Sequence, residues 1–179
     1  KSLREIFLER RWFTPVAPGT RHVTLGGMVA ADIHGKNHHL AGCFGEHVRA
    51  LKVRVADGRV LELSMDSEPE LFLATLGGMG LTGHILEVEF QMERIPSPWI
   101  YEESLRLPNL EAVLEGLKDS AEAWPMTVAW IDTTASGKKS GRGILMRGRW
   151  ATPLEAPEHP PQLKKTVNVP FNFPSGLAN

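Results

Sequence analysis

The stretch LKVRVADGRVLEL, residues 51–63, constrains the fold more than any other part of the 179-residue sequence. Apolar and polar residues alternate on both sides of Asp57-Gly58, as expected of two strands that each have one buried face. An Asp-Gly pair accepts the positive φ angles of a type I′ turn. The stretch therefore predicts a β-hairpin with a type I′ turn, and with it an antiparallel sheet.

Helix signals occur at three other places along the sequence. Residues 2–11, SLREIFLERR, have helical spacing. Ser67 and Glu70 form a predicted capping box, with Pro69 in the first turn, where its missing N–H costs nothing. Asn109 is the predicted N-cap of the third helix. The predicted apolar face of that third helix consists of Leu110, Val113, Leu114 and Leu117.

Three further strands are expected. The segment HILEVEFQM, residues 84–92, predicts a strand with Val88 on one face and Ile85 on the opposite face, free to pack on a ring system. Residues 126–134 and 142–150 predict two strands joined by a polar loop. Strands interspersed with helices make the fold class α+β.

The composition changes at IPSPW, residues 95–99. We place a domain boundary there because proline-rich joints are places where few contacts cross. The predicted first domain covers residues 1–95 and the second covers residues 96–179. The tail from Ala151 has no periodicity and is expected to be irregular.

The formal net charge is −1, which gives no electrostatic argument for binding nucleic acid or an anionic membrane. No apolar run approaches the roughly 20 residues that span a bilayer, so no transmembrane segment is expected. The single cysteine, Cys43, excludes an internal disulfide. The sequence begins within a helical pattern and stops within a loop pattern, as expected of a fragment.

The glycine-rich stretch from Gly78 to Gly83 reads G-x-G-x-x-G. A dinucleotide-binding reading requires a strand before this motif and a helix after it, whereas the predicted order here is helix, loop, strand. That reading fails, and the stretch is interpreted as a turn that lets the backbone approach a neighbour closely. SGKKSG lacks the spacing of a phosphate loop, and no G-x-S-x-G hydrolase elbow occurs.

A zinc site is the alternative reading of the histidine-rich region. His34 and His38 have i, i+4 spacing, and Cys43 and His47 could complete a set of four ligands. Gly35 and Asn37, which lie between the two histidines, disfavour a helix, and the gaps match no standard zinc module. Histidines that line a polar pocket or form structural hydrogen bonds are therefore the favoured reading, with no metal expected.

Residues 18–34 remain as a possible mould for a cofactor. Small residues keep this surface shallow, and threonine hydroxyls lie beside backbone N–H groups in a loop that suits a diphosphate. The residues that suggest this are Gly19, Thr20, Thr24, Gly26, Gly27, Ala30 and Ala31.

The sequence from residue 15 to 48, PVAPGTRHVTLGGMVAADIHGKNHHLAGCFGEHV, resembles the flavin domain of FAD-linked oxidases of the vanillyl-alcohol oxidase (PCMH) superfamily. ELFLATLGGMGLTGHI, residues 70–85, resembles a second signature of that superfamily. The run from His34 to His39 is similar to the decaprenylphosphoryl-β-D-ribose 2′-oxidases within it. The resemblance continues at residues 128–132, 141–143 and 173–179. It implies a second FAD-binding (PCMH-type) subdomain followed by the start of an antiparallel-sheet substrate domain.

The resemblance implies roles for particular residues. His34 and Lys36 match positions on the substrate side of the flavin and are the candidate catalytic residues, and Trp130 with Lys36 matches the substrate pocket. The positions that match flavin contacts are Gly19, Thr24, Leu25, Gly26, Gly27, Ala31, Asp32, Ile33, His34 and Ile85.

The chemistry implied by the resemblance is hydride transfer from a secondary alcohol of a sugar to flavin N5, which gives a ketone. The implied cofactor is FAD, bound non-covalently. Cys43 departs from the family, which has Ser there, and a covalent flavin link at this thiol is a minor alternative. The implied substrate is a small-molecule or lipid-linked sugar resembling decaprenylphosphoryl-ribose, and the implied pathway is cell-wall biosynthesis.

A partner reductase that completes an epimerisation is also implied, and the compartment is either cytoplasmic or membrane-associated and periplasmic. The fragment alone is expected to be inactive, because other pocket groups and the diphosphate-binding loop of the family lie outside it. The alternatives are a related sugar, alditol or lactone oxidase, and a non-catalytic module with the flavin fold that binds a partner.

Overall fold

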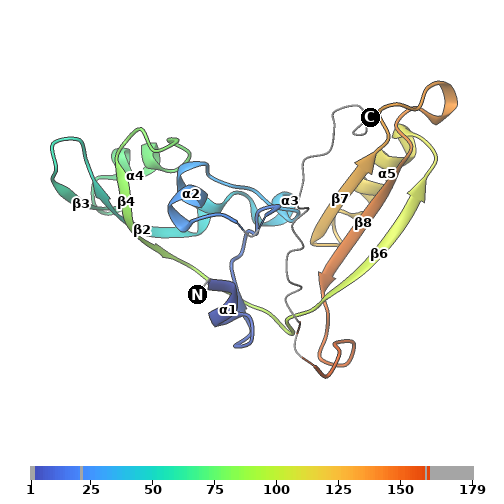
Figure 1. Ribbon diagram of the computed structural model, residues 1–179, viewed down its shortest axis with the longest axis horizontal. Helices are drawn as coiled ribbons and strands as arrows, with labels where there is room; N and C mark the ends of the chain where they lie inside the picture. Colours follow the sequence, from blue (N-terminus) through green and yellow to red (C-terminus); the bar gives the residue numbers. More distant parts are fainter. Residues whose placement is uncertain (1–2, 21, 160, 162–179) are drawn as a thin grey trace, which may run out of the picture.

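The computed structural model describes residues 3–20, 22–159 and 161. Figure 1 shows the elements gathered into two groups that lie side by side. The first group contains α1 (Leu3–Phe7), β1 (Trp12–Phe13), α2 (Leu25–Ala30), α3 (His38–Ala41), η1 (Phe44–His47), β2 (Val48–Arg54), β3 (Val60–Ser64), α4 (Pro69–Thr75), β4 (His84–Phe90) and β5 (Glu93–Arg94). The second group contains β6 (Ile100–Leu107), α5 (Leu110–Ser120), β7 (Met126–Ile131), η2 (Gly137–Lys139) and β8 (Gly143–Trp150).

All strand pairs in the described structure are antiparallel. The first group holds a sheet of order β3-β2-β4 and the small pair β1-β5, and the second holds a sheet of order β6-β8-β7. The fold is therefore a mixture of helices and antiparallel sheets, as the α+β prediction requires.

The predicted hairpin is confirmed, but its turn differs from the predicted type. Only Gly58 is left-handed, with φ of +89°, whereas a type I′ turn also needs a positive φ at Asp57. Gly58 N–H donates to the Val55 carbonyl at 2.9 Å, and Val55 N–H donates to the Arg59 carbonyl at 3.0 Å. These bonds describe the alternative loop in which a left-handed glycine follows an ordinary turn.

The core of the first group lies between the β3-β2-β4 sheet and helix α2, which packs against β4. Phe44 from η1 is fully buried there and packs against the Phe90 ring, with 5.3 Å between ring centroids. The buried members of this core are Val16, Met28, Val29, Phe44, Val48, Leu51, Val53, Leu63 and Phe72.

The face predicted for Ile85 is wrong. The register of β2 and β4 shifts between Lys52 and Val53, so that Leu86 is an extra residue without a partner. A bulge of this kind interrupts the alternation of side chains along a strand. Ile85 and Val88 therefore both pack against the core, and Leu86 is 40% exposed.

Helix α4 begins one residue later than the capping box predicts. Glu68 is its N-cap, in a left-handed conformation with φ of 55° and no side-chain cap, and Pro69 lies in the first turn as predicted. The Ser67 hydroxyl donates instead to the Glu62 carbonyl at 3.2 Å. The predicted helix over residues 2–11 is also shorter, since α1 ends at Phe7.

The predicted cap of α5 is confirmed, because the Asn109 side chain accepts a hydrogen bond from Ala112 N–H at 2.9 Å. Its predicted apolar face is wrong in part. Val113 is fully buried, but Leu110 and Leu114 are 44% and 50% exposed. The buried face turns instead toward Gly116, where an added Cβ would come within 3.0 Å of the Leu145 side chain.

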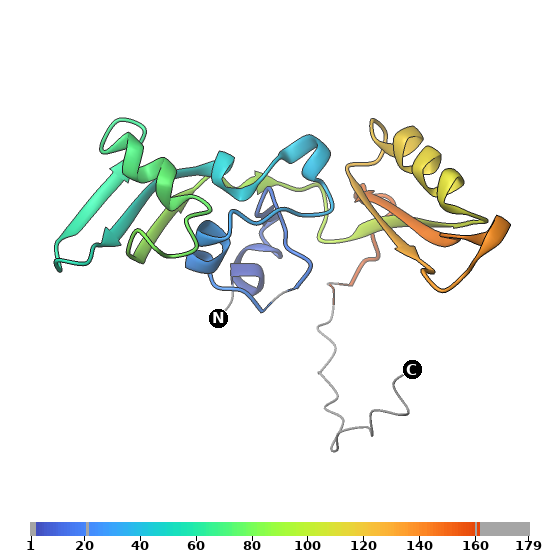
Figure 2. The same cartoon turned by 90° about the horizontal axis from the view of Figure 1, so that it is seen from above.

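Strand β6 has no counterpart among the predicted strands, yet it pairs with β8 along eight residue pairs from Ile100↔Trp150 to Leu107↔Gly143. Figure 2 shows α5 lying along one side of the β6-β8-β7 sheet, the side that Leu145 faces. Residues that alternate with Leu145, and their cross-strand partners, point to the other side. We call this other side the cavity face; it carries Ile100, Glu102, Ser104, Arg106, Met126, Val128, Trp130, Ile144, Met146, Gly148 and Trp150.

The proline-rich joint between the groups is hydrogen-bonded on both sides. Ile95 N–H donates to the Arg11 carbonyl at 3.0 Å, and the buried Ser97 hydroxyl donates to the Ala151 carbonyl at 2.7 Å. Ala151 N–H donates in turn to the Trp99 carbonyl at 2.8 Å. These bonds hold residues 95–99 between the first group and the end of β8.

The end of α2 is held by backbone bonds from distant segments. Gly77 N–H and Met79 N–H donate to the carbonyls of Val29 and Ala30, at 2.9 and 2.8 Å. Asp32, left-handed with φ of 40°, accepts a 2.7 Å bond from Gly45 N–H through its carboxylate. The glycine stretch thus brings backbone close to a neighbour, as the sequence predicts for it, and the neighbour is α2.

We predict that Asp32→Ala destabilises the fold. The substitution removes a charge-assisted bond to the N–H of buried Gly45, and such bonds contribute about 1.5–3 kcal/mol. Chemical denaturation should show the loss as a lower midpoint, with Asp66→Ala, at an exposed position, as the matched control. Equal midpoints for the two variants would contradict this role of Asp32.

The carboxylate of Glu155 predicts a pH dependence. Paired hydrogen bonds from Arg149, with further bonds from Thr152, lower the pKa of Glu155 from 4.5 to about 2. A pKa that is lower in the folded state contributes stability above the unfolded pKa, and this contribution is lost as the pH falls toward 2. Glu155→Gln should therefore lower Tm near neutral pH, and the difference from wild type should shrink as the pH falls toward 2 and vanish below it.

Tm measured against pH checks this prediction, with Glu158→Gln, also exposed, as the control. A difference between wild type and Glu155→Gln that stays constant from neutral pH to about pH 2 would show that the Arg149 pairing does not act through the ionised carboxylate.

Candidate functional site

The predicted cofactor mould is in part a helix. The sequence reading treats residues 24–31 as loop, but Leu25–Ala30 form α2, with Thr24 as N-cap accepting a bond from Gly27 N–H at 3.0 Å. Two glycines disfavour a helix, yet burial of Met28 and Val29 stabilises it. The small residues Gly26, Gly27 and Ala30 therefore lie on a helix rather than in a loop.

The predicted flavin contacts divide into an exposed set and a half-buried set. Gly19, Thr24, Gly27, Ala31 and His34 are exposed, and Leu25, Gly26, Asp32, Ile33 and Ile85 are half-buried. A Cβ added to Gly26 would lie 3.6 Å from the Cβ of Ile85, so these two predicted contacts, far apart in sequence, meet in the fold. A Cβ added to Gly19 would meet no atom within 4 Å, which leaves its backbone open to a ligand.

Asp32 and Ile33 use their side chains inside the protein. The Asp32 carboxylate binds Gly45 N–H, and Ile33 packs against the core. Their predicted contacts with a flavin are therefore best assigned to backbone atoms, and they stay predictions.

The loop that carries His34 and Lys36 is fixed at three points. A Cβ added to Gly35 would lie 2.5 Å from the Ala17 carbonyl oxygen, so the two backbones approach at a distance that only glycine permits. The Asn37 amide donates to the carbonyl of buried Pro15 at 2.6 Å. The Lys36 carbonyl accepts a bond from Thr127 N–H of β7 at 3.0 Å.

A cavity of about 500 Å³ lies where this loop meets the cavity face. It brings together Lys36 and Trp130, the two predicted substrate-pocket residues, from the two groups of elements. His34 is not among its lining residues and lies exposed beside it in sequence. The lining residues are Phe13, Thr14, Pro15, Ala17, Pro18, Lys36, Asn37, Glu93, Ile100, Glu102, Met126, Val128, Trp130, Met146, Arg147, Gly148 and Trp150.

The cavity also holds charged groups that the sequence reading missed. Burial raises the pKa of the Glu93 carboxyl, which favours its protonated form more than usual. Arg147 is neutralised by Glu103, with 2.8 Å between Nη2 and Oε2. Glu93 reaches the cavity through its pairing with Phe13, a contact across 80 residues that no local pattern signals.

The histidines and the cysteine are close neighbours. His34 and His38 form an edge-to-face pair with 5.4 Å between ring centroids, and Cys43 Sγ lies 3.9 Å from His38 Nδ1. Desolvation, with the charges of Asp32 and Glu46, raises the pKa of the Cys43 thiol. Within residues 3–20, 22–159 and 161, no group of three or more His, Cys, Asp or Glu is arranged to hold a metal ion.

In the same described part of the chain, no helix has the length and apolar character needed to cross a bilayer.

Comparison with known proteins finds an FAD-binding family model and several relatives, one of them named as FAD-linked. Residues 2–64 match the family model described as FAD binding domain. Decaprenylphosphoryl-β-D-ribose oxidase of Mycolicibacterium smegmatis is 38% identical over 178 residues, which cover 93% of this chain and 38% of that protein. A Streptomyces coelicolor protein, described as an uncharacterized protein in the mprA 5′ region, is 35% identical over 179 residues, 98% of this chain and 48% of its own length.

The FAD-linked oxidoreductase pytB of Aspergillus terreus is 37% identical over 75 residues, which cover 41% of this chain and 9% of that protein. The chain spans less than half the length of each of these relatives. The family match and the names of the relatives together point to FAD as the cofactor, in agreement with the resemblance in the sequence.

We predict that Asn37→Ala lowers the free energy of unfolding by about 1–3 kcal/mol, because it leaves the carbonyl of buried Pro15 without its amide donor. Asn37→Asp should cost at least as much, since an ionised carboxylate cannot donate a hydrogen bond. Urea denaturation checks both variants, and His39→Ala at an exposed position two residues on is the control. If Asn37→Ala matched His39→Ala, the bond to Pro15 would have no part in fixing the loop.

Proposed function

We propose that this chain, a relative of the FAD-linked oxidoreductases, is part of an FAD-dependent oxidase that converts a secondary alcohol of a sugar into a ketone. The observation that carries the proposal is the cavity of about 500 Å³ described above, here called the junction cavity, which is lined by both Lys36 and Trp130. Lys36 follows directly on the segment predicted to contact the flavin. Trp130 comes from the sheet predicted to begin the substrate domain, so one cavity adjoins both halves of the predicted site.

The residues in the mould fit a flavin. The mould contains the small residues Gly19, Gly26, Gly27, Ala30 and Ala31, and the open backbone at Gly19 suits a diphosphate. Ile85, held against Gly26, offers an apolar side chain for a ring system. When bound, FAD supplies the hydride acceptor that no protein side chain provides. We propose non-covalent attachment, because the raised pKa of Cys43 makes its thiol a poor nucleophile.

The cavity fits a sugar. Lys36 and Glu102 can hydrogen-bond hydroxyl groups, and the rings of Trp130 and Trp150 offer apolar walls. The relative from M. smegmatis is named for decaprenylphosphoryl-β-D-ribose, and we propose a substrate of that class, a lipid-linked pentose. A partner reductase that reduces the ketone again would complete an epimerisation.

In the proposed mechanism, Lys36 donates a hydrogen bond that orients the reacting hydroxyl group. This ammonium group has no salt bridge to another described residue, so it is available to a ligand. His34, exposed two residues away, accepts or passes on the hydroxyl proton at an imidazole nitrogen. The division at residues 95–96 then separates the flavin-binding part from the substrate-binding part.

We predict that Lys36→Met and His34→Ala lower the rate of flavin reduction by about 10²-fold or more, the usual range for a positioned acid or base. Both variants should still bind FAD. The measurement is anaerobic bleaching of flavin absorbance by a prenylphosphoryl-ribose in the full-length protein, with Lys138→Met, in the exposed η2 turn, as the control.

The possible results separate the parts of the proposal. A colourless full-length protein that takes up no added FAD would overturn the cofactor assignment. Bound flavin that no sugar reduces would overturn the proposed oxidation, and wild-type bleaching rates in Lys36→Met and His34→Ala would remove those residues from the mechanism.

A further inference from the structure

The junction cavity runs along the cavity face between two tryptophans. Trp130 lies at one end and Trp150 at the other, and the register of β7 and β8 places them six residues apart along the strands, about 20 Å. The Lys36 carbonyl binds the N–H of Thr127, which pairs with Arg147, midway between these two positions. The Lys36 loop therefore meets the sheet about 10 Å from either end of the cavity.

Glu93 lines the end of the junction cavity at which Trp150 lies. In the register of β1 and β5 it is opposite Phe13, and cross-strand partners project from the same face of a ribbon. The Phe13 ring packs edge-to-face against Trp150, with 5.3 Å between ring centroids. Arg94, the next residue, lies over the Trp12 ring on the other face of the ribbon. The Glu93 carboxyl group therefore faces the cavity beside two aromatic rings, and the neighbouring guanidinium faces away.

The Glu93 carboxyl group forms no hydrogen bond or ion pair with any residue that the structure describes. Desolvation raises its pKa more than the charge of His47 lowers it. Glu102, the other carboxyl group of the cavity, already accepts a bond from the Ser104 hydroxyl at 3.0 Å. A polar group that loses water without gaining a partner costs free energy, and a ligand with hydroxyl groups restores the missing bonds.

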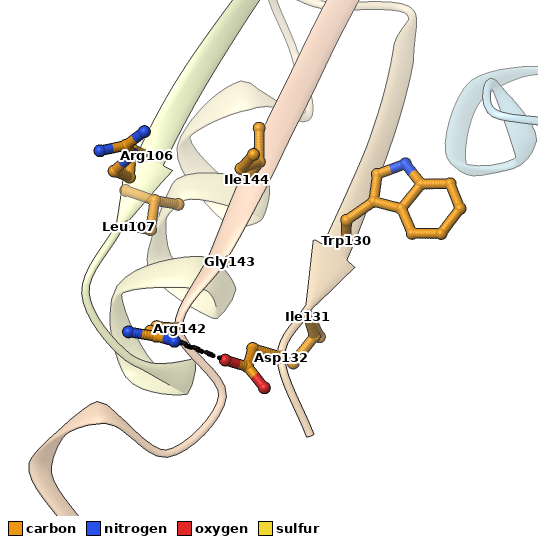
Figure 3. Close-up of a pocket in the computed structure, with 8 residues that line it drawn as sticks. All are labelled: Arg106, Leu107, Trp130, Ile131, Asp132, Arg142, Gly143 and Ile144. Carbon is orange, nitrogen blue, oxygen red and sulfur yellow. Dashed lines mark hydrogen bonds and ion pairs between the residues drawn. The ribbon is translucent and has the colours of Figure 1, made fainter. Parts of the chain in front are cut away.

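A second cavity, of about 420 Å³, shares Trp130 with the junction cavity and lies at the other end of the sheet (Figure 3). Its carboxylate is already bound. Arg142 donates to Asp132 through Nε and Nη2, both at 2.9 Å, and the Thr134 hydroxyl donates at 2.7 Å. A ligand would have to displace these bonds, so among the described residues the carboxyl group available to a ligand in these two cavities is that of Glu93.

We propose that Glu93 is a specificity residue of the junction cavity, and that its carboxyl group binds a hydroxyl group of the sugar other than the one that is oxidised. The inference rests on the proposed function, since it concerns the same substrate in the same cavity. A carboxylate accepts a hydrogen bond from a hydroxyl group, and a protonated carboxyl group can also donate one. The Lys36 loop meets the sheet about 10 Å from the Trp150 end, and two side chains of this length bring their polar ends within reach of one sugar ring.

The test measures calorimetric binding and anaerobic flavin reduction in the full-length flavin-loaded protein. The probes are a prenylphosphoryl-ribose and its 3-deoxy and 5-deoxy analogues, which keep the hydroxyl group at C2. Glu93→Ala should weaken the parent compound about tenfold or more, and weaken far less the one analogue that lacks the bonded hydroxyl group. The rate of flavin reduction at saturating sugar should stay unchanged.

Two further variants complete the test. Glu93→Gln keeps a hydrogen-bonding group of the same size and should lose less affinity than Glu93→Ala. Glu89→Ala, the same change at an exposed position of β4 outside the cavity, is the matched control and should bind all three probes like wild type.

Equal loss of affinity for all three probes in Glu93→Ala, or no loss for any of them, would overturn the inference. A slower flavin reduction with unchanged affinity would also overturn it, since that is the behaviour of a proton acceptor. The proposed function is read separately, from bleaching of the wild-type flavin. Bleaching with no dependence of affinity on Glu93 would overturn the inference alone, whereas the expected pattern of affinities without any bleaching would support the Glu93 contact and overturn the oxidase.

Discussion

The backbone bonds at the end of α2 determine where the rest of the candidate site lies. A helix of six residues with two glycines has little stability of its own, and its last carbonyls lack partners within the helix. Gly77 and Met79 supply two of the missing donors, and the Asp32 carboxylate holds Gly45 in addition. Three segments distant in sequence therefore meet at one point, and the chain leaves that point directly into His34.

The loop that follows α2 is joined to the β6-β8-β7 sheet through backbone atoms. The Lys36 carbonyl binds Thr127 N–H, and Asn37 uses its amide on Pro15. Because main-chain groups make the bond to β7, the Lys36 ammonium group takes no part in holding the loop. Lys36 and Asn37 thus make the structural contacts, while the group proposed for chemistry is a different atom of Lys36. A lysine can serve both purposes only where its carbonyl and side chain point to different partners.

Local patterns predicted the elements whose cause is local, such as the hairpin at Asp57-Gly58 and the Asn109 cap. Local patterns gave wrong predictions where contacts between distant segments determine the structure. The two glycines of α2 argue against a helix in the sequence, but burial of Met28 and Val29 stabilises it. The bulge at Leu86 places Ile85 on the face opposite to the one predicted. The family resemblance selected Lys36 and Trp130, which the structure brings into one cavity. Neither pattern nor resemblance indicated Glu93, because only the pairing of β1 with β5 places it there.

Because residues alternate along β7 and β8, one face of their sheet packs against α5 and the other face lines the cavities. Leu145 faces α5 and is fully buried, so that side of the pleat stabilises the fold. Ile144 and Met146, its neighbours, face the cavities and contribute little to that core. Substitutions at the cavity face should therefore have small effects on stability, since they leave the packing of α5 intact. A sheet covered by a helix on both sides could not offer this separation, because every strand position would then belong to a core.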